Sequence, residues 1–170
     1  MPPSVVVGAS FLIAPSFVVL MASLHSCAPD SKKVWSQIGL SFAIIYAVVV
    51  GLNYFLFLTV VQQNPQLYSW LSMDLRPDSA FWALEVLGYT FMSLGALFLA
   101  PLLTGGRIEH TIRWLFVGNA ALNIIAVAAY LQTVNPVHPL VLGSLGLWGV
   151  VFPIATALLA VVFRRGEPIG

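Results

Sequence analysis

The stretch that decides the fold is residues 37–61, which read QIGLSFAIIYAVVVGLNYFLFLTVV. It contains no Asp, Glu, Lys or Arg. It is also longer than the roughly 20 mostly apolar residues with which an α-helix crosses about 30 Å of hydrocarbon. The segment therefore predicts a helix that spans a membrane.

The composition of the whole chain supports this prediction. Of its 170 residues, 59% are hydrophobic and 8% are charged, whereas a soluble domain carries about 25% charged residues. Because so few charges cannot cover a surface for water, lipid must be the solvent. The net charge of +1 gives no electrostatic reason to expect nucleic acid as a partner. The single cysteine, Cys27, excludes an internal disulfide framework.

Four further stretches have the length and hydropathy of membrane spans, and short segments rich in Pro, Gly and Asn separate them. We therefore expect an all-α integral membrane bundle of five transmembrane helices, with residues 1–170 forming a single domain. The predicted spans are residues 4–24, 37–61, 79–103, 112–132 and 139–163.

The positions of the cations predict the orientation of the bundle. Six of the seven Lys and Arg residues fall on one side of a five-span bundle, namely Lys32, Lys33, Arg107, Arg113, Arg164 and Arg165. Arg76 alone falls on the other side, partly balanced by Asp74 and Asp78. Because cytoplasmic loops carry an excess of Lys and Arg, the N-terminus is predicted outside and the C-terminus inside. Membrane lipids are the expected partners, with headgroup contacts at Lys32, Lys33 and Arg113.

The longest connection, residues 62–78, has an amphipathic pattern. Asn64 is a suitable helix cap and Pro65 a suitable first residue. Leu67, Trp70, Leu71 and Leu75 would then share one face. We expect a short amphipathic helix on the outer surface, which serves either as an anchored connector or as a lid over a cavity.

Small residues predict how the helices pack, because close backbone approach replaces the hydrophobic drive in lipid. In the second span, Gly39, Ala43, Ala47 and Gly51 form one seam that serves internal packing or a homo-oligomer. The face that carries Tyr46 and Asn53 is expected about 160° away from this seam. Pro15 and Pro153 should kink their spans, with or without opening a cavity.

Glu85 is the one carboxylate predicted well within a span, roughly 9 Å below the outer end. An ionised carboxylate at that depth costs several kcal/mol unless it is paired, so we expect Glu85 to be protonated, hydrogen-bonded or facing water. Amides in two other spans fall at similar depth, so polar groups can converge there. The predicted cluster joins Glu85 with Asn53, Asn123 and Tyr89, while Asn119 and Tyr46 continue the same helix faces.

Two interpretations of this cluster stay open at this point. It is either a self-satisfied polar knot that fixes helix register, or a ligand or proton site. His25 and His110 fall at inner helix ends and are interpreted as boundary residues rather than haem ligands. The chain has no His-Glu-x-x-His, Cys-x-x-Cys, Gly-x-Ser-x-Gly or P-loop motif. We therefore expect no catalytic residue, cofactor or metal.

Several motifs resemble a known group of proteins. The runs 38–47, 53–55, 58–61, 84–89 and 113–116 are similar to the DUF4386-like uncharacterised prokaryotic multi-pass membrane proteins. This resemblance covers most of the chain after residue 36. It implies the cytoplasmic membrane of a bacterium or archaeon, and it implies no activity.

The absence of catalytic motifs and the Glu85 cluster together favour a non-enzymatic bundle. Its expected role is to bind a lipid or another small lipophilic ligand, or to act as a sensory or accessory subunit. The first alternative is a small proton-coupled transporter or oligomeric channel in which Glu85 exchanges a proton. An intramembrane enzyme is the third.

Overall fold

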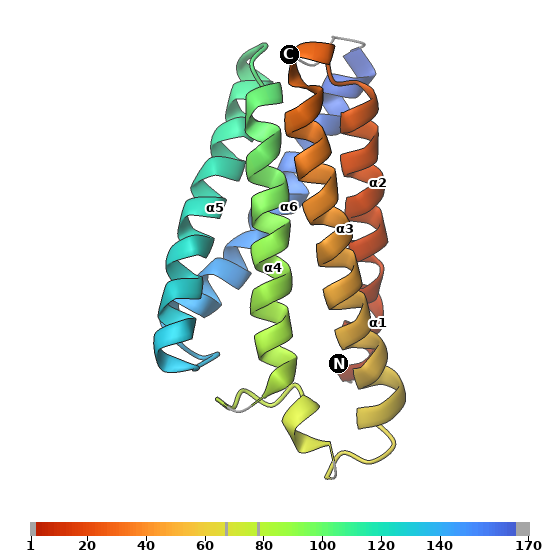
Figure 1. Cartoon of the computed structure of the whole chain (residues 1–170), viewed down its shortest axis with the longest axis vertical. Helices are drawn as coiled ribbons and strands as arrows, with labels where there is room; N and C mark the ends of the chain where they lie inside the picture. The colour runs from red at the N-terminus through yellow and green to blue at the C-terminus, as the bar shows by residue number, and fades with distance from the viewer. Residues whose placement is uncertain (1–2, 67, 78, 166–170) are drawn as a thin grey trace.

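The computed structural model describes residues 3–66, 68–77 and 79–165, and this part of the chain is all-helical (Figure 1). Its α-helices are α1 (Pro3–Phe11), α2 (Ile13–Ser26), α3 (Lys33–Leu56), α4 (Ala80–Leu99), α5 (Arg107–Thr133) and α6 (Pro139–Arg165). Three short segments of 3-10 or π type adjoin them, and η3 (Ser69–Leu71) stands alone in a connection; the three are η1 (Asp30–Lys32), η2 (Phe57–Val61) and η4 (Ala100–Leu102).

Five segments of the described chain are long and apolar enough to cross a membrane, as predicted. They are Val7–Ser26, Asp30–Val61, Ala80–Leu102, Arg107–Thr133 and Pro139–Arg165. Several exceed the predicted spans, since backbone hydrogen bonds continue beyond the apolar stretch that hydropathy detects. The clearest case is α5, which begins at Arg107 rather than at Ile112.

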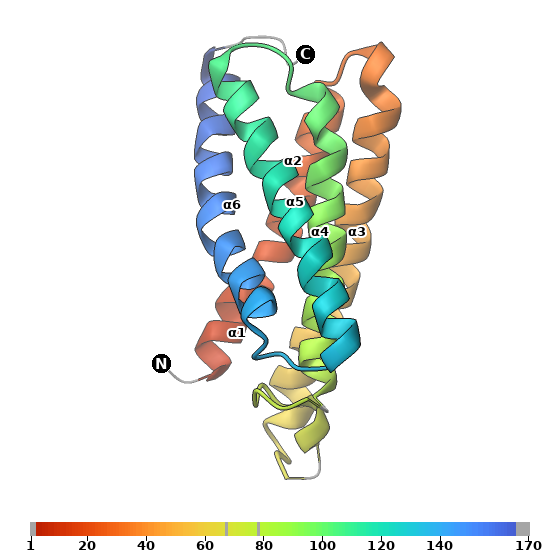
Figure 2. The same ribbon diagram turned by 90° about the vertical axis from the view of Figure 1, so that its left-hand side faces the viewer.

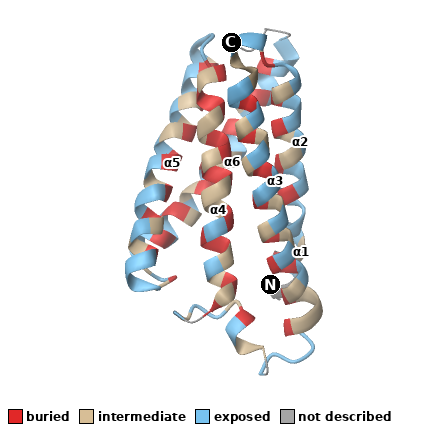
Figure 3. Ribbon diagram, in the orientation of Figure 1, coloured by how far each residue is buried: buried red, intermediate tan, exposed pale blue. Residues whose placement is uncertain are grey.

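The helices pack mainly in chain order: α2 against α3, α3 against α4, α4 against α5 and α5 against α6 (Figures 1 and 2). One end of the bundle, here called the loop end, carries the connection 62–79. The opposite end, the basic end, carries Lys32, Lys33, Arg107, Arg164 and Arg165. Buried residues line the facing sides of the helices (Figure 3).

The predicted amphipathic helix in the connection 62–78 is wrong. In the described part of this connection the helical structure after Val61 is one three-residue turn, η3. Leu71 is buried, whereas Trp70 and Leu75 are 50% and 51% exposed, so these residues share no face. Leu67 and Asp78 lie outside the described residues.

Tertiary hydrogen bonds explain why no helix forms there. The backbone is extended at Ser72, whose carbonyl oxygen accepts the Ser79 hydroxyl at 2.7 Å. The Trp82 indole N–H donates to the carbonyls of Met73 and Asp74, each at 3.1 Å. These bonds tie the connection to the start of α4. Local helical propensity takes no account of such tertiary bonds, so it could not indicate the extended segment.

Pro15 divides the first span into two helices. Because proline has no N–H, it cannot donate to the Phe11 carbonyl, and α1 ends at that residue. The chain resumes as α2 at Ile13 after a turn at Leu12, and the axis changes direction there (Figure 2). Pro153 lies inside α6, which continues through it.

The seam of small residues on α3 packs partly inside the chain. A Cβ on Gly39 would lie 3.0 Å from the Gly95 carbonyl oxygen of α4, so two backbones meet here. Ala43 is also buried, whereas Ala47 is half-buried and Gly51 has open space at its Cβ position. Gly39 and Ala43 are therefore packed inside the chain and not available to a second copy. A homo-oligomer contact stays a prediction for the other two residues of the seam, Ala47 and Gly51.

The expected 160° separation of the seam from the face of Tyr46 and Asn53 is wrong. Gly39, Ala43, Tyr46 and Asn53 are all buried. Ala43 and Tyr46 are three residues apart, so their side chains are separated by only about 60° around the helix axis. The buried face of α3 thus carries small residues toward the basic end and polar or aromatic ones toward the loop end.

Candidate functional site

The side chain of Glu85 lies in the second turn of α4 and accepts two side-chain hydrogen bonds from α3. The Asn53 amide nitrogen donates to Oε1 at 3.0 Å, and the Tyr54 hydroxyl donates to Oε2 at 3.1 Å. Glu85 is 5% exposed. The structure therefore brings Glu85 and Asn53 into direct contact.

Asn53 is fixed by a further bond, since its amide nitrogen also donates to the Phe81 carbonyl at 3.1 Å. Tyr54 is a site residue that sequence analysis missed. It follows Asn53 directly, and its ring stacks on Phe81 with centroids 6.1 Å apart. The sequence signal that could have found it is spacing, because positions 46, 50, 53, 54 and 57 share one helix face, and the structure buries all of them.

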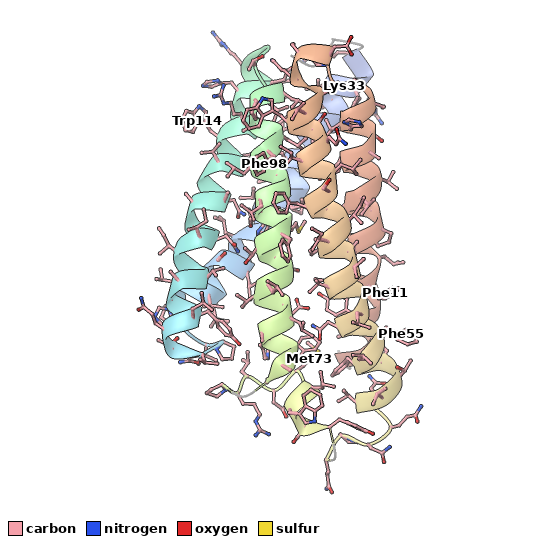
Figure 4. The ribbon with its side chains drawn as sticks, in the orientation of Figure 1. Phe11, Lys33, Phe55, Met73, Phe98 and Trp114 are labelled. Atoms are coloured by element: carbon pink, nitrogen blue, oxygen red, sulfur yellow. The ribbon has the colours of Figure 1, made fainter. Side chains whose placement is uncertain are left out.

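Glu85 lines a cavity of about 350 Å³, here called the Glu85 cavity. Its walls come from α1, α3, α4, α6 and the connection before α4. Four aromatic residues share it with Glu85: Tyr54, Phe81, Trp82 and Tyr89. Ser10 of α1 lies in the wall, and Met73 contributes from the connection at the loop end, where Figure 4 labels it.

A second cavity of about 240 Å³, the Pro153 cavity, adjoins the first. Tyr89 and Leu145 line both, so the two cavities lie side by side, and together they are here called the groove. The remaining walls are mostly apolar, from Ile13, Met92, Trp148, Gly149, Phe152 and Pro153.

The groove lies beside the break in the first span and beside Pro153 of α6. Ile13 begins α2 just after the break in the first span, and Pro153 itself lines the Pro153 cavity. Because proline cannot donate to the residue four positions earlier, the Gly149 carbonyl receives no N–H from Pro153. Helix irregularity at membrane depth is tolerated where it lines a cavity.

Asn123 does not join Glu85. It lies on α5, and its amide nitrogen donates to the Ser144 hydroxyl of α6 at 3.2 Å. Asn119 lies on the same face, buried, and neither its amide nitrogen nor its amide oxygen has a hydrogen-bond partner. The predicted single cluster is thus two: one between α3 and α4, and one between α5 and α6.

The remaining predicted tyrosines have different surroundings. Tyr89 lines both cavities. Tyr46 is almost fully buried and packs edge-on against Phe17 and Tyr89, with ring centroids 5.6 and 6.0 Å apart. Tyr46 therefore supports the position of Tyr89 from the core.

The predicted headgroup residues lie near the basic end. Lys32 donates to the Thr104 hydroxyl at 2.7 Å and so joins two connections, while Lys33 and Arg113 are half-buried. Glu109 does not pair with Arg113; its carboxylate accepts the Gly105 N–H at 2.6 Å, at the start of α5. Trp114 points away from the bundle in Figure 4.

The histidines have local partners. His25 shares a 2.8 Å hydrogen bond with Ser36, and the Trp114 indole donates to His110 at 2.9 Å. Within the described ranges, no group of three or more His, Cys, Asp or Glu residues could hold a metal ion.

The fold and composition together define the class, a helical protein with five apolar segments that suit a multi-pass membrane protein. No family model, no curated protein and no solved structure matches this chain. The resemblance to DUF4386-like proteins therefore stays a prediction, and function must be argued from the groove.

Proposed function

We propose that the protein is a multi-pass protein of the cytoplasmic membrane of a bacterium or archaeon. Its basic end would face the cytoplasm, with the N-terminus outside. The charge distribution supports this orientation, since Lys32, Lys33, Arg107, Arg164 and Arg165 gather at one end. The loop end and the Glu85 cavity would then lie in the outer half of the membrane.

Within this setting we propose a non-enzymatic role in binding a small lipophilic ligand in the groove. The observation that carries the proposal is that Glu85, buried in a helix long and apolar enough to span a membrane, lines a cavity of about 350 Å³. A polar knot that serves only helix register needs no such space beside it. Binding pockets combine mostly apolar walls with a few placed polar groups, and their volumes begin near 300 Å³.

The described part of the connection before α4, residues 69–77, supports the proposal as a cover for the groove. Met73 lines the Glu85 cavity, and its carbonyl is held by the Trp82 indole. A few hydrogen bonds on an irregular segment are cheaper to break than a transmembrane helix is to move. Ligand entry from the loop end would therefore open this connection first.

Native mass spectrometry of protein released from mild detergent tests the proposal. We expect an extra mass on the wild-type chain that survives activation and is weakened in Glu85→Gln. Glu109→Gln is the matched control, because Glu109 is also buried but accepts a backbone N–H at the basic end. A bare polypeptide, or equal retention in Glu85→Gln, would contradict the proposal.

One observation favours a second candidate, a proton-coupled transporter. Glu85 is held by neutral donors from Asn53 and Tyr54, so its charge state can change without breaking an ion pair. Flux of a ligand that moves with protons into liposomes would support transport. Binding without flux, in correctly inserted protein, would leave the binding role alone.

A further inference from the structure

The electrostatics of the groove point to the charge of its ligand. Glu85 is the one ionisable acid or base, apart from the tyrosines, among the described residues that line either cavity. Its two hydrogen-bond partners, the Asn53 amide and the Tyr54 hydroxyl, are neutral. No Lys, Arg or His of the described chain lines the groove to balance the carboxylate.

A carboxylate in this position has hydrogen-bond donors but no opposite charge beside it. Two neutral donors replace part of the hydration that Glu85 loses on burial, but they supply no opposite charge. In a low-dielectric site, an opposite charge a few ångströms away stabilises the anion much more than it would in water. The cavity beside Glu85 has room for such a group, so the missing charge can come from the ligand.

The aromatic residues of the Glu85 cavity favour the same class of ligand. Tyr54 and Phe81 stack with centroids 6.1 Å apart, and Phe81 meets Trp82 edge-on at 5.7 Å. With Tyr89 they form an aromatic wall next to one carboxylate. Ring faces carry partial negative charge and attract ammonium groups, most strongly where water is excluded.

The rest of the groove suits an apolar portion of the ligand. The Pro153 cavity lies next to the Glu85 cavity, and Tyr89 and Leu145 line both. Met92, Trp148 and Phe152 supply apolar surface there. A ligand that fills both cavities would have a charged group at Glu85 and a hydrophobic part pointing toward Pro153.

We infer that the groove binds a hydrophobic organic cation, with its ammonium group against Glu85 and the aromatic wall and its apolar part in the Pro153 cavity. This inference rests on the proposed binding function and names its ligand class. A neutral or anionic amphiphile would leave the Glu85 carboxylate without an opposite charge, or place a second negative charge beside it.

The test is binding of a charged and a neutral probe of the same shape to the full chain in lipid nanodiscs. The cation is radiolabelled trimethyl(4-phenylbutyl)ammonium, and the competitor is its isostere with carbon in place of nitrogen. Empty nanodiscs measure partition into lipid. We expect saturable binding of the cation to wild-type protein and no displacement by the neutral isostere.

Three variants locate the charge effect. Glu85→Gln should weaken cation binding at least about tenfold, because it removes the negative charge that faces the quaternary ammonium, and attraction between opposite charges is strong where water is excluded. Phe81→Leu should weaken it by about two- to fivefold through the lost ring face. Glu109→Gln should bind as wild type does. Size-exclusion profiles and thermal unfolding confirm that each variant is folded.

The outcomes separate this inference from the function on which it rests. Displacement by the neutral isostere as strong as by unlabelled cation would overturn it, as would unchanged cation binding in folded Glu85→Gln. Absence of cation binding would overturn it as well. If native mass spectra then show a retained neutral ligand, the binding function still stands. If they show the polypeptide alone, both the cation inference and the binding function are contradicted.

Discussion

The contact between α3 and α4 changes in character from the basic end to the loop end. Toward the basic end the two backbones touch, with a Cβ on Gly39 only 3.0 Å from the Gly95 carbonyl oxygen. Toward the loop end the same helices are joined by side chains, through Asn53 and Tyr54 to Glu85. Backbone contact leaves no space between helices, whereas side-chain bridges leave a cavity beside them. Close backbone packing and the Glu85 cavity thus lie toward opposite ends of this contact.

The two buried glutamates show the same division. Glu109, at the basic end, accepts the Gly105 N–H at 2.6 Å and stabilises the start of α5. Glu85, toward the loop end, accepts only side-chain donors and faces a cavity. The backbone N–H accounts for the burial of Glu109, whereas the proposed ligand is what would account for the burial of Glu85 beside a cavity.

The largest effect is expected from breaking the backbone contact. Gly39→Leu should lower the free energy of unfolding by about 3 kcal/mol or more, at the upper end of overpacking costs, because its Cβ meets backbone. Gly51→Leu is the control on the same helix, with nothing within 4 Å of its Cβ position. It should change stability by less than about 0.5 kcal/mol.

Unfolding in mixed micelles, followed by circular dichroism during a titration with sodium dodecyl sulfate, measures both variants. Equal losses would mean that the backbone contact is not special. A shift of Gly51→Leu to a smaller assembly on size exclusion would instead show that Ala47 and Gly51 form an oligomer contact.

The next effect is expected at the loop-end bridge. Asn53→Ala removes the donor to Glu85 Oε1 and to the Phe81 carbonyl. Because a bond to a charged group contributes about 1.5–3 kcal/mol, stability should fall by that amount in the same titration. A loss below about 0.5 kcal/mol would show that the carboxylate does not depend on this bond.

A smaller effect is expected between α5 and α6. Ser144→Ala removes a neutral hydrogen bond with Asn123, and such bonds in membranes average about 0.6 kcal/mol. The same unfolding titration should therefore separate it from Asn53→Ala. A larger loss of stability in Ser144→Ala than in Asn53→Ala would contradict the expectation that the Glu85 cluster stabilises the bundle more than the Asn123 cluster does.

The smallest effect on global stability is expected from Trp82→Phe. The ring is kept, but the indole N–H no longer holds the Met73 and Asp74 carbonyls. We expect less than about 0.5 kcal/mol in unfolding, together with faster hydrogen exchange across residues 69–79. Unchanged exchange would contradict the role of Trp82 in holding this connection over the groove.

Hydropathy predicted the five spans because length and apolar content suffice for that inference. Depth along the helix also predicted that Asn53 and Glu85 could meet, as they do. Depth does not determine helix rotation or neighbour order, so Asn123 was placed with Glu85 although α5 turns it toward Ser144. Tyr54 was missed for a related reason, since its role depends on how α3 faces α4.

The connection 62–78 was mispredicted for a different physical reason. Local propensity suggested a helix, but Ser72, Ser79 and Trp82 form tertiary bonds that favour an extended segment. The groove itself could not be predicted, because it depends on where α1 lies relative to α2 across the break before Pro15, and on where α6 lies. Only the kink at Pro15, not the space around it, follows from the sequence.

The most direct test of the central claim measures the charge preference of the groove itself. Cys27 is the single cysteine, so Cys27→Ser gives a background in which Ser10→Cys places one thiol in the wall of the Glu85 cavity. The rates of modification by cationic and anionic methanethiosulfonates of similar size are then compared, with and without Glu85→Gln. The account predicts faster reaction with the cationic reagent, a preference that Glu85→Gln removes. An unreactive thiol, or a preference that does not depend on Glu85, would contradict it.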